Sequence, residues 1–340
     1  MRVYLLAAAV LLVAVPRAHA RAGPGSTTAN FLKIGVGPRP SALGGAFVGL
    51  ADDVNAIYYN PGGLGMLQRQ EMTFMHHSLY EGVRQEWGAY ALPTRKLGTF
   101  AMSFDQVSVS PFPAYDESDI PMGSVDSSER AFTLGYGYEF GTSRWLSLGV
   151  AAKYISSRLW TYTASAGAVD AGMIWRFGRE VEYDTEYRFG AAIRNIGPGM
   201  KYVSESFNLP QSLNLGISRN GPLPHPFEDM RMVAMLEAVV PNDDLPFVAV
   251  GIETKLVREF AVRLGYRQNQ DTGLGITAGI GFTSLSRGFT AEWWPEISID
   301  YSFVDYGKLD MSHRIGFSLA FGDNKLGETT PPSLFDTFNK

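Results

Sequence analysis

From residue 70 to residue 322 the chain alternates apolar side chains with small or polar ones, with a period of two residues. Leu146, Leu148 and Val150, for example, alternate with Ser147 and Gly149. Successive side chains of a strand point to opposite faces, so each such run predicts a strand with one greasy face and one small or polar face. The runs are about ten residues long, which is enough to cross a bilayer when a strand is tilted.

Two architectures produce this alternation. A soluble sandwich or barrel turns the apolar face inward, whereas a membrane barrel turns it outward to lipid and encloses the polar face. Three features favour the membrane barrel: the strand length, the Gly, Ala and Ser residues beside charges on the opposite face, and the aromatic residues near the strand ends, where interfacial girdles lie. These aromatic residues are Tyr138, Phe140, Tyr154, Trp175, Phe177 and Phe321.

We therefore predict an all-β chain that forms a transmembrane antiparallel β-barrel of about fourteen strands. The expected strands are 70–79, 85–92, 98–107, 128–140, 144–157, 163–177, 185–195, 211–219, 229–239, 247–256, 258–268, 273–283, 296–305 and 312–322. An even count puts both barrel ends of the chain on the periplasmic side. The long segments 108–127 and 197–210 are then expected to be irregular outer loops, and 93–97, 141–143 and the turn near Val257 short periplasmic turns.

Residues 31–67 break this pattern, because Gly and Pro recur throughout them. Leu43, Ala46, Phe47 and Leu50 have helical spacing, and Asp52 or Asp53 is positioned to cap a second helical turn that runs to Tyr58. The sequence Asn-Pro-Gly-Gly at residues 60–63 predicts a compact turn. A segment so small in side chains and so rich in turns can fold inside the barrel. We expect residues 21–68 to form an N-terminal plug, or hatch, within a barrel of residues 69–322.

The two ends of the chain carry other signals. Arg2, an apolar run over residues 5–15 and Ala18-His19-Ala20 predict a signal peptide over residues 1–20, cleaved near Ala20. The run is too short for a membrane anchor, since spanning takes roughly 20 residues. Residues 323–340 predict a disordered periplasmic tail. The chain has no cysteine, which excludes disulfides and a lipidated N-terminal cysteine, and its net charge of −5 argues against a nucleic-acid partner.

Both ends of the mature sequence resemble the PorV/PorQ family of outer-membrane proteins, which is related to the FadL-like long-chain fatty-acid transporters. The resemblance is carried near the C-terminus by Arg263-Leu264-Gly265-Tyr266, Gly279-Ile280-Gly281, Asp300-Tyr301 and the strand from His313 to Gly322. In the N-terminal segment it is carried by a hatch motif of Gly35, Arg39, Gly44, Gly45, Asp52, Asp53, Asn55, Asn60, Pro61, Gly62 and Gly63. The fatty-acid transporters have Asn-Pro-Ala where this chain has Asn60-Pro61-Gly62. The resemblance implies a plugged barrel of about fourteen strands, and some PorV-type members serve type nine secretion.

The face predicted to point inward carries charged residues. These lumen-facing candidates are Lys153, Asp170, Arg176, Arg194, Glu253, Arg263, Arg267, Asp300 and Arg314. An unpaired buried charge costs several kcal/mol, so we expect them to pair with each other or with the plug; the alternative is a path for a solute.

The remaining groups of polar residues in the sequence predict neither a catalytic site nor a metal site. Ser312 and His313 near Asp310 are neighbours in one strand and do not form a triad, so we expect no enzyme. The adjacent His76 and His77 point to opposite faces and do not share an ion. The acidic residues Asp116, Glu117, Asp119 and Asp126 of the first outer loop lack the spacing of an EF-hand, and calcium binding there stays open. We expect neither a resident metal nor a cofactor.

Two functions remain for an exported barrel of this kind in the outer membrane of a Gram-negative-type bacterium. The first is binding or passive transport of hydrophobic small molecules. The alternative is a docking or shuttle component for protein secretion and surface attachment. The expected partners are outer-membrane lipid and the barrel-assembly machinery, with a hydrophobic ligand in the first case and secretion-system proteins or cargo in the second.

Overall fold

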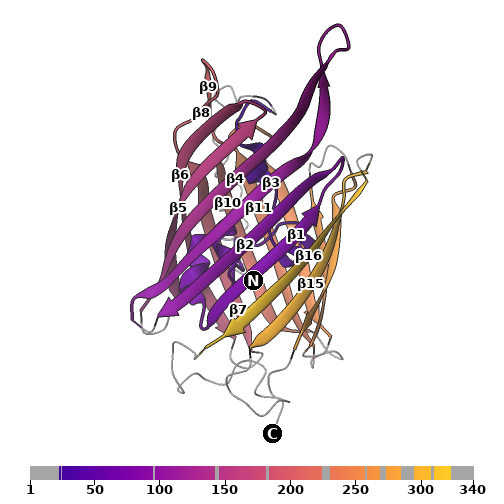
Figure 1. Ribbon diagram of the computed structural model, residues 1–340. Helices are drawn as coiled ribbons and strands as arrows, with labels where there is room; N and C mark the ends of the chain where they lie inside the picture. Colours follow the sequence, from indigo (N-terminus) through magenta and orange to yellow (C-terminus); the bar gives the residue numbers. More distant parts are fainter. Residues whose placement is uncertain are drawn as a thin grey trace.

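Fourteen strands form one closed antiparallel barrel in the computed structural model (Figure 1), which confirms the predicted fold class. The strands are β1 (Gln70–Ser78), β2 (Val83–Thr94), β3 (Gly98–Tyr115), β4 (Pro121–Phe140), β5 (Leu146–Leu159), β6 (Tyr162–Glu180), β7 (Thr185–Ile196), β10 (Ser212–Pro222), β11 (Arg231–Pro241), β12 (Phe247–Lys255), β13 (Phe260–Arg267), β14 (Ile276–Thr283), β15 (Glu296–Asp305) and β16 (Met311–Phe321). Each strand pairs with its neighbours in this order, and β1 pairs with β16 to close the ring.

The structure describes residues 23, 25–94, 96–141, 145–180, 184–223, 230–256, 259–268, 273–284, 295–307 and 310–322. The predicted signal peptide and the predicted C-terminal tail lie outside these residues. No helix in the described ranges is long and apolar enough to cross a membrane.

The two faces of the wall have the predicted orientation. On the outer face Leu134 and Val150 are about half exposed, at 54% and 51%. Their strand neighbours Thr133 and Ala151 point inward and are buried. Exposed large apolar side chains continue around the ring on every barrel strand except β10, whose outward side chains are half-buried. This outer surface is called the apolar belt below.

The end of the barrel where β1 begins and β16 ends is called the base, and the opposite end the rim. At the rim the expected irregular loop 108–127 is wrong. β3 and β4 continue past the barrel wall as a paired hairpin with two register shifts (Figure 1). Mostly half-buried serines and valines sustain the alternation of this two-stranded ribbon, so the ladder does not stop where the barrel does. Within 197–210 a small sheet of β8 (Met200–Lys201) and β9 (Ser206–Phe207) forms.

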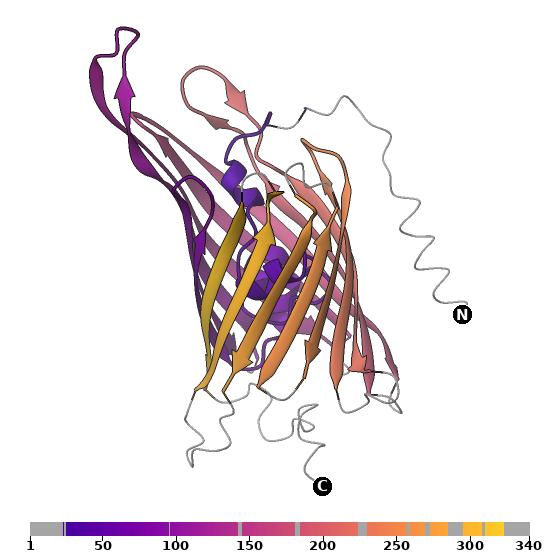
Figure 2. The same cartoon turned by 90° about the vertical axis from the view of Figure 1, so that its right-hand side faces the viewer.

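The N-terminal segment lies inside the barrel and runs from the rim to the base, where it joins β1 (Figure 2). It contains η1 (Asn30–Lys33), α2 (Pro38–Ala42), α3 (Ala56–Tyr59) and η2 (Pro61–Met66). We call residues 25–68 the hatch. Its apolar side chains form two buried clusters with the wall, one around Phe47 and Tyr59 and one around Phe31 near the rim.

The helix expected over Leu43 to Leu50 is wrong. α2 ends at Ala42, because Gly44 and Gly45 follow with φ of +68° and +81° and turn the chain out of the helical conformation. Leu43 and Leu50 are nevertheless fully buried. The cap also differs from expectation: Asn55 occupies the N-cap of α3, and the carboxylate of Asp53 accepts a hydrogen bond from the backbone N–H of Asn55 at 2.8 Å.

The apolar belt predicts what happens when a charged side chain is placed on the lipid-facing surface of the barrel. We expect Leu148→Arg to block membrane assembly, because an Arg on the lipid face of a barrel strand costs roughly 2–4 kcal/mol near the bilayer midplane. The matched control is Ser156→Arg, on the same face of β5 but beyond the last aromatic residue of the belt, Tyr154. Heat-modifiable migration of the membrane fraction on gels measures assembly. Equal assembly of the two variants would contradict the placement of Leu148 in the part of the apolar belt that faces the bilayer midplane.

Candidate functional site

The hatch touches the wall where the wall has no side chains. A Cβ atom built on Gly149 would lie 2.1 Å from the carbonyl oxygen of Pro61, and one on Gly190 would lie 2.0 Å from that of Val48. Several inward glycines make such contacts with the hatch. Seven of them are called the glycine girdle: Gly137, Gly149, Gly172, Gly190, Gly216, Gly251 and Gly265. Many are register partners, as Gly137 is with Gly149 and Gly149 with Gly172. Adjacent bare positions on neighbouring strands thus make a strip along which backbone packs on backbone.

Asn60 of the hatch motif is completely buried and fixes this packing. Its side-chain amide donates to the carbonyl oxygens of Val48 at 2.8 Å and Met173 at 2.9 Å, and its Oδ1 accepts from the N–H of Gly62 at 3.1 Å. The first bond joins two turns of the hatch, the second joins the hatch to β6, and the third caps η2. One side chain therefore satisfies three buried backbone groups, each of which would be costly unpaired.

The other glycines of the motif serve close approaches within the hatch. A Cβ on Gly63 would lie 2.0 Å from the carbonyl oxygen of Ala51, and one on Gly35 would lie 2.9 Å from the hydroxyl of Tyr59. Gly62 packs against the backbone of Met173 in β6. Pro61 begins η2, where its missing N–H costs nothing.

Arg39 joins the hatch to β12 through a network of buried charges. Its guanidinium binds both carboxylate oxygens of Glu253, with Nε–Oε2 of 2.8 Å and Nη2–Oε1 of 2.9 Å, and its Nη1 binds Asp52 at 2.6 Å and Asp53 at 2.9 Å. Burial raises the pKa of the Asp53 carboxyl, and the charge of Arg39 opposes this rise. The same Glu253 accepts a bond from Arg263 at 2.6 Å.

The network extends to β15, because Arg263 also binds Asp300 at 2.5 Å. Arg39, Glu253, Arg263 and Asp300 therefore form one chain of alternating charges, called the ion-pair relay below. The structure brings together three of the lumen-facing candidates with the hatch-motif residue Arg39. Bidentate geometry offsets part of the desolvation cost of these groups and also fixes the position of α2.

Two wall residues that the sequence analysis missed hold the hatch by its backbone. Glu237 of β11 accepts from the N–H groups of Phe47 at 2.8 Å and Val48 at 2.9 Å. Thr277 of β14 accepts from the N–H of Gly44 and donates to the carbonyl of Ala42, both at 2.9 Å. Glu237 is detectable in the sequence as the single charge within the apolar run 232–240 of β11, whereas nothing local distinguishes Thr277.

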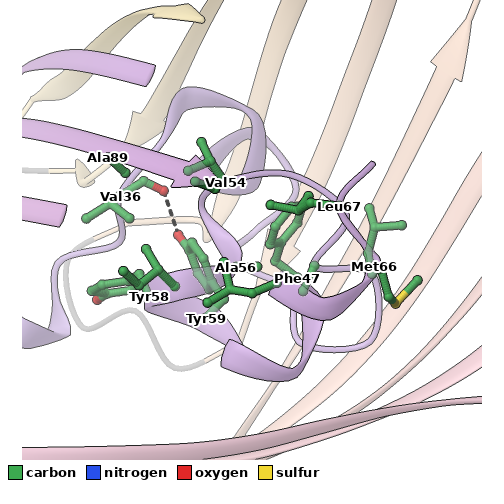
Figure 3. Packing of buried hydrophobic residues seen from close by; sticks show 14 of the residues in the cluster. Val36, Phe47, Val54, Ala56, Tyr58, Tyr59, Met66, Leu67 and Ala89 are labelled. Atoms are coloured by element: carbon green, nitrogen blue, oxygen red, sulfur yellow. Dashed lines mark hydrogen bonds between the residues drawn. The ribbon is translucent and has the colours of Figure 1, made fainter. Parts of the chain in front are cut away.

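An aromatic cluster fills the lumen between these anchors (Figure 3). The hydroxyl of Tyr59 donates to the carbonyl of Val36 at 2.9 Å, and the ring of Tyr59 packs edge-on against Phe47. The guanidinium of Arg194 lies 4.1 Å from the ring centroid of Tyr58. Asn55 of the hatch motif accepts from the indole N–H of Trp87 at 3.1 Å and so ties α3 to β2.

The other lumen-facing candidates lie apart from the ion-pair relay. Lys153 binds Asp170 at 2.7 Å, and Arg176 binds Glu139 at 3.0 Å. Arg267 lies over the ring of Phe247, 4.3 Å from its centroid. Arg314 is buried, and its Nε and Nη1 have no hydrogen-bond partner among the described residues.

Among the described residues two polar cavities lie in the lumen, and both are bordered by β12 and β13. Cavity 1, of about 270 Å³, lies toward the base and is lined by the ion-pair relay together with Asp52, Asp53 and Lys255. Cavity 2, of about 120 Å³, lies toward the rim and is lined by residues that include Arg194, Glu237 and Arg267. At the rim the hatch closes over cavity 2, where Asp243 binds both Lys33 and the hydroxyl of Thr27.

A third hollow, of about 740 Å³, lies on the outer face of β1, β2, β3 and β16 and is almost entirely apolar. Its lining includes Phe74, Tyr90, Met102, Phe104 and Phe317. We call it the aromatic hollow.

The remaining expected positions form no site. His76 is exposed and binds Glu86, whereas His77 is buried and contacts Gln85, so the two rings point to opposite faces as expected. Asp116, Glu117 and Asp119 lie at the tip of the β3–β4 hairpin and Asp126 within β4. In the part of the chain that the structure describes, no group of three or more His, Asp or Glu side chains is arranged to hold a metal ion.

The fold and the lumen together define a fourteen-stranded barrel whose N-terminal segment fills its interior. Solved structures with a similar fold include the Ralstonia pickettii toluene transporter TbuX, with a TM-score of 0.52 at 11% identity over 85% of this chain and 98% of that chain. The Pseudomonas putida toluene transporter TodX gives 0.51 at 12% over 90% and 98%, and the CymD monoaromatic hydrocarbon channel 0.51 at 13% over 86% and 98%. No protein-family model and no curated protein matches the chain. At such low identity the likeness concerns the fold.

The glycine girdle predicts that a small side chain there displaces the hatch. We expect Gly149→Val to loosen the hatch by about 1–3 kcal/mol, the usual cost of overpacking a filled interior. The control is Gly167→Val on the neighbouring strand β6, where a Cβ would meet only one atom, at 3.9 Å. Trypsin cleavage after Lys33 in the folded barrel measures the loosening. Resistance of Gly149→Val equal to that of Gly167→Val would show that the close contact has no such role.

Proposed function

We propose that this protein is an outer-membrane barrel that binds hydrophobic small molecules and allows their passive transport, with the hatch as the closing element. The observation that carries the proposal is the aromatic hollow. It lies on the outer face of the wall, next to the buried cluster around Phe47 and Tyr59 of the hatch. The apolar belt supports the membrane location, because closed barrels with this inverted pattern span bilayers. The solved structures with a similar fold include two toluene transporters and a monoaromatic hydrocarbon channel, which supports the same class of solute.

The aromatic hollow has the lining that an apolar solute needs. Phe74, Met102 and Phe104 are each 43% to 53% exposed and surround a space without charged side chains, apart from the His76–Glu86 pair at one end. A small aromatic molecule dissolved in the surrounding lipid would gain edge and face contacts with these rings.

The aromatic hollow and the buried cluster around Phe47 and Tyr59 lie on the two sides of the same part of the wall. Met75, Trp87 and Ala89 line the hollow and also belong to the buried cluster that contains the hatch. Gly88 supplies no side chain on the outer face, and Gly316 supplies none where the wall meets Pro38 of α2. An apolar molecule in the hollow is therefore separated from the hatch by the backbone of the wall and the inward side chains Met75, Trp87 and Ala89.

Passage from the hollow into the lumen requires a rearrangement. The pairing of β1 with β2 is continuous from Glu71–Ala91 to Ser78–Arg84, and that of β2 with β3 is continuous from Val83–Val109 to Thr94–Gly98. The hatch is the movable element beside this wall, because it is joined to β1 and β2 by few bonds, among them Asn55 to Trp87 and the N–H of Val54 to Glu71.

Filling the hollow tests this function. We expect Gly88→Phe to reduce uptake of labelled toluene by producing cells about tenfold, the equivalent of roughly 1.4 kcal/mol of lost apolar contact. A Cβ at Gly88 would lie 3.5 Å from the ring of Phe74 and 3.9 Å from the carbonyl oxygen of Thr73, both ordinary contacts, so the barrel should still assemble. The control is Ile280→Phe, which adds the same side chain to the outer face of β14, far from the hollow. Uptake by Gly88→Phe at the level of the control would remove the basis of the proposal.

A second candidate is a docking component of PorV/PorQ type for protein secretion and surface attachment. The observation that favours it is the β3–β4 hairpin, which projects past the rim (Figure 1) and exposes four large apolar side chains. These are Phe112, Tyr115, Ile120 and Met122, each more than half exposed. Exposed apolar patches of this kind mark protein contacts, and an uptake channel has no need of them.

The hairpin separates the two candidates. For the docking role we expect replacement of Phe112, Tyr115, Ile120 and Met122 by Ser to release surface-attached proteins into the medium, since the apolar contact that would hold them is gone. Quantitative proteomics of the cell surface and the medium measures this, and toluene uptake should stay unchanged. An unaltered surface proteome would exclude docking through this hairpin and leave the uptake function unaffected.

A further inference from the structure

The two polar cavities of the lumen lie on the same strands and are separated by a single turn of the hatch. On the inward face of β12, Phe247 and Ala249 line cavity 2, and Glu253 and Lys255 line cavity 1. Gly251 lies between these pairs and lines neither cavity. On β13 the same order recurs, with Arg267 in cavity 2, Arg263 in cavity 1 and Gly265 between them.

Residues 42–45 of the hatch, called the gate turn, cover these two glycines. A Cβ on Gly251 would lie 2.8 Å from Leu43, and one on Gly265 would lie 2.1 Å from the backbone nitrogen of Gly44. Gly251 and Gly265 are register partners, and Gly265 is in turn the partner of Thr277. The gate turn therefore lies across the row of inward register partners Gly251, Gly265 and Thr277, with cavity 2 on the rim side and cavity 1 on the base side.

One side chain of the wall holds the gate turn by its backbone. The Oγ1 of Thr277 accepts from the N–H of Gly44 and donates to the carbonyl of Ala42, both at 2.9 Å. The hatch on either side is held separately, by the bond of Arg39 to Glu253 and by those of Phe47 and Val48 to Glu237. The gate turn can thus move while its two flanks remain in place, and a Cβ on Gly45 would meet nothing within 4 Å.

The lining of the cavities suits a charged solute rather than an apolar one. The described residues that line cavity 1 include seven carboxylates and three basic side chains. Those that line cavity 2 include three carboxylates, Glu237, Asp243 and Asp244, and three basic side chains, Lys33, Arg194 and Arg267. A passage with this excess of carboxylates at the base concentrates cations.

We propose that cavities 2 and 1 are the two halves of a second, polar route through the barrel, which passes small cations when the gate turn leaves Gly251 and Gly265. This route follows the inner face of the wall along β12 and β13, with β7, β10 and β11 beside cavity 2 and β14, β15, β16 and β1 beside cavity 1, whereas the aromatic hollow lies on the outer face of β16, β1, β2 and β3. It therefore does not depend on the proposed transport of hydrophobic molecules. In the state described here Leu43 and Gly44 close it.

The test is the current that purified full-length protein carries across a planar lipid bilayer in potassium chloride. Thr277→Val keeps the shape of the side chain and removes both bonds to the gate turn, so the closed state loses population. We expect its mean conductance to rise about tenfold above that of the unsubstituted protein. In a salt gradient the reversal potential should lie toward the equilibrium potential of K⁺.

A second variant opens the same gate by a different cause. Gly265→Ala places a methyl group where the backbone of Gly44 lies, and it should raise the conductance even if the hydrogen bonds to Thr277 contribute little. The control is Thr133→Val, which makes the same exchange at a buried inward position of β4 that lines neither cavity. Far-ultraviolet circular dichroism and heat-modifiable migration confirm that each barrel is folded.

The proposal stands if both gate variants conduct more than the control and prefer K⁺ over Cl⁻. It is overturned if folded Thr277→Val and Gly265→Ala both conduct no more than Thr133→Val. A reversal potential on the side of Cl⁻ would overturn the assignment to cations. Combining each gate variant with Gly88→Phe, which fills the aromatic hollow, should leave the raised conductance unchanged, and this distinguishes the polar route from the hydrophobic one.

Discussion

The structure depends on direct contact between the hatch backbone and strips of wall that carry no side chains. At Gly149, Gly172 and Gly190 the hatch lies so close that not even a methyl group fits. The register of the barrel and the conformation of the hatch are therefore fixed together. Because the side-chain period of a strand is two, a slip of one residue would replace these glycines by outward residues such as Leu148 or Val150 and expel the hatch. Because these glycines carry no side chains, they leave the space in the lumen that the hatch backbone occupies.

The sequence predicts the barrel well because a period of two is a local signal. The strand that contains Leu148 can be recognised, and its greasy face assigned, without knowledge of any other strand. The β3–β4 hairpin was mistaken for a loop because its serines and valines form a ladder in water, where neither face has to be apolar. The helix expected at Leu43 to Leu50 failed for a different reason: Gly44 and Gly45 outweigh the apolar spacing, and the buried side chains are held by the wall instead.

The site was predictable only in part. Charges on the inward face, such as Glu253 and Arg263, stand out against small neighbours, so a paired role could be expected of them. Their joining to Arg39 could not be foreseen, because that contact spans more than 200 residues of sequence. Thr277 is an ordinary inward threonine in sequence, and its role appears only when the N–H of Gly44 and the carbonyl of Ala42 lie on either side of its hydroxyl. Long-range contacts with backbone groups leave no local pattern.

The hatch is attached to the two halves of the barrel by different chemistry, and this difference bears on what can move. Toward β4, β5, β6 and β7 the contacts are mostly backbone on glycine with the amide of Asn60 between them, and any displacement there opens unfilled space along a whole strip. Toward β11 to β14 the hatch also contacts glycines, Gly251 and Gly265, but there it is held in addition by the side chains of Glu237, Glu253 and Thr277, with cavities beside them. A side-chain bond can be exchanged for a bond to a solute or water at small net cost, whereas lost packing has no such substitute. Opening of the lumen is therefore expected on the side of β12 to β14, while the side of β4 to β7 keeps the hatch in the barrel.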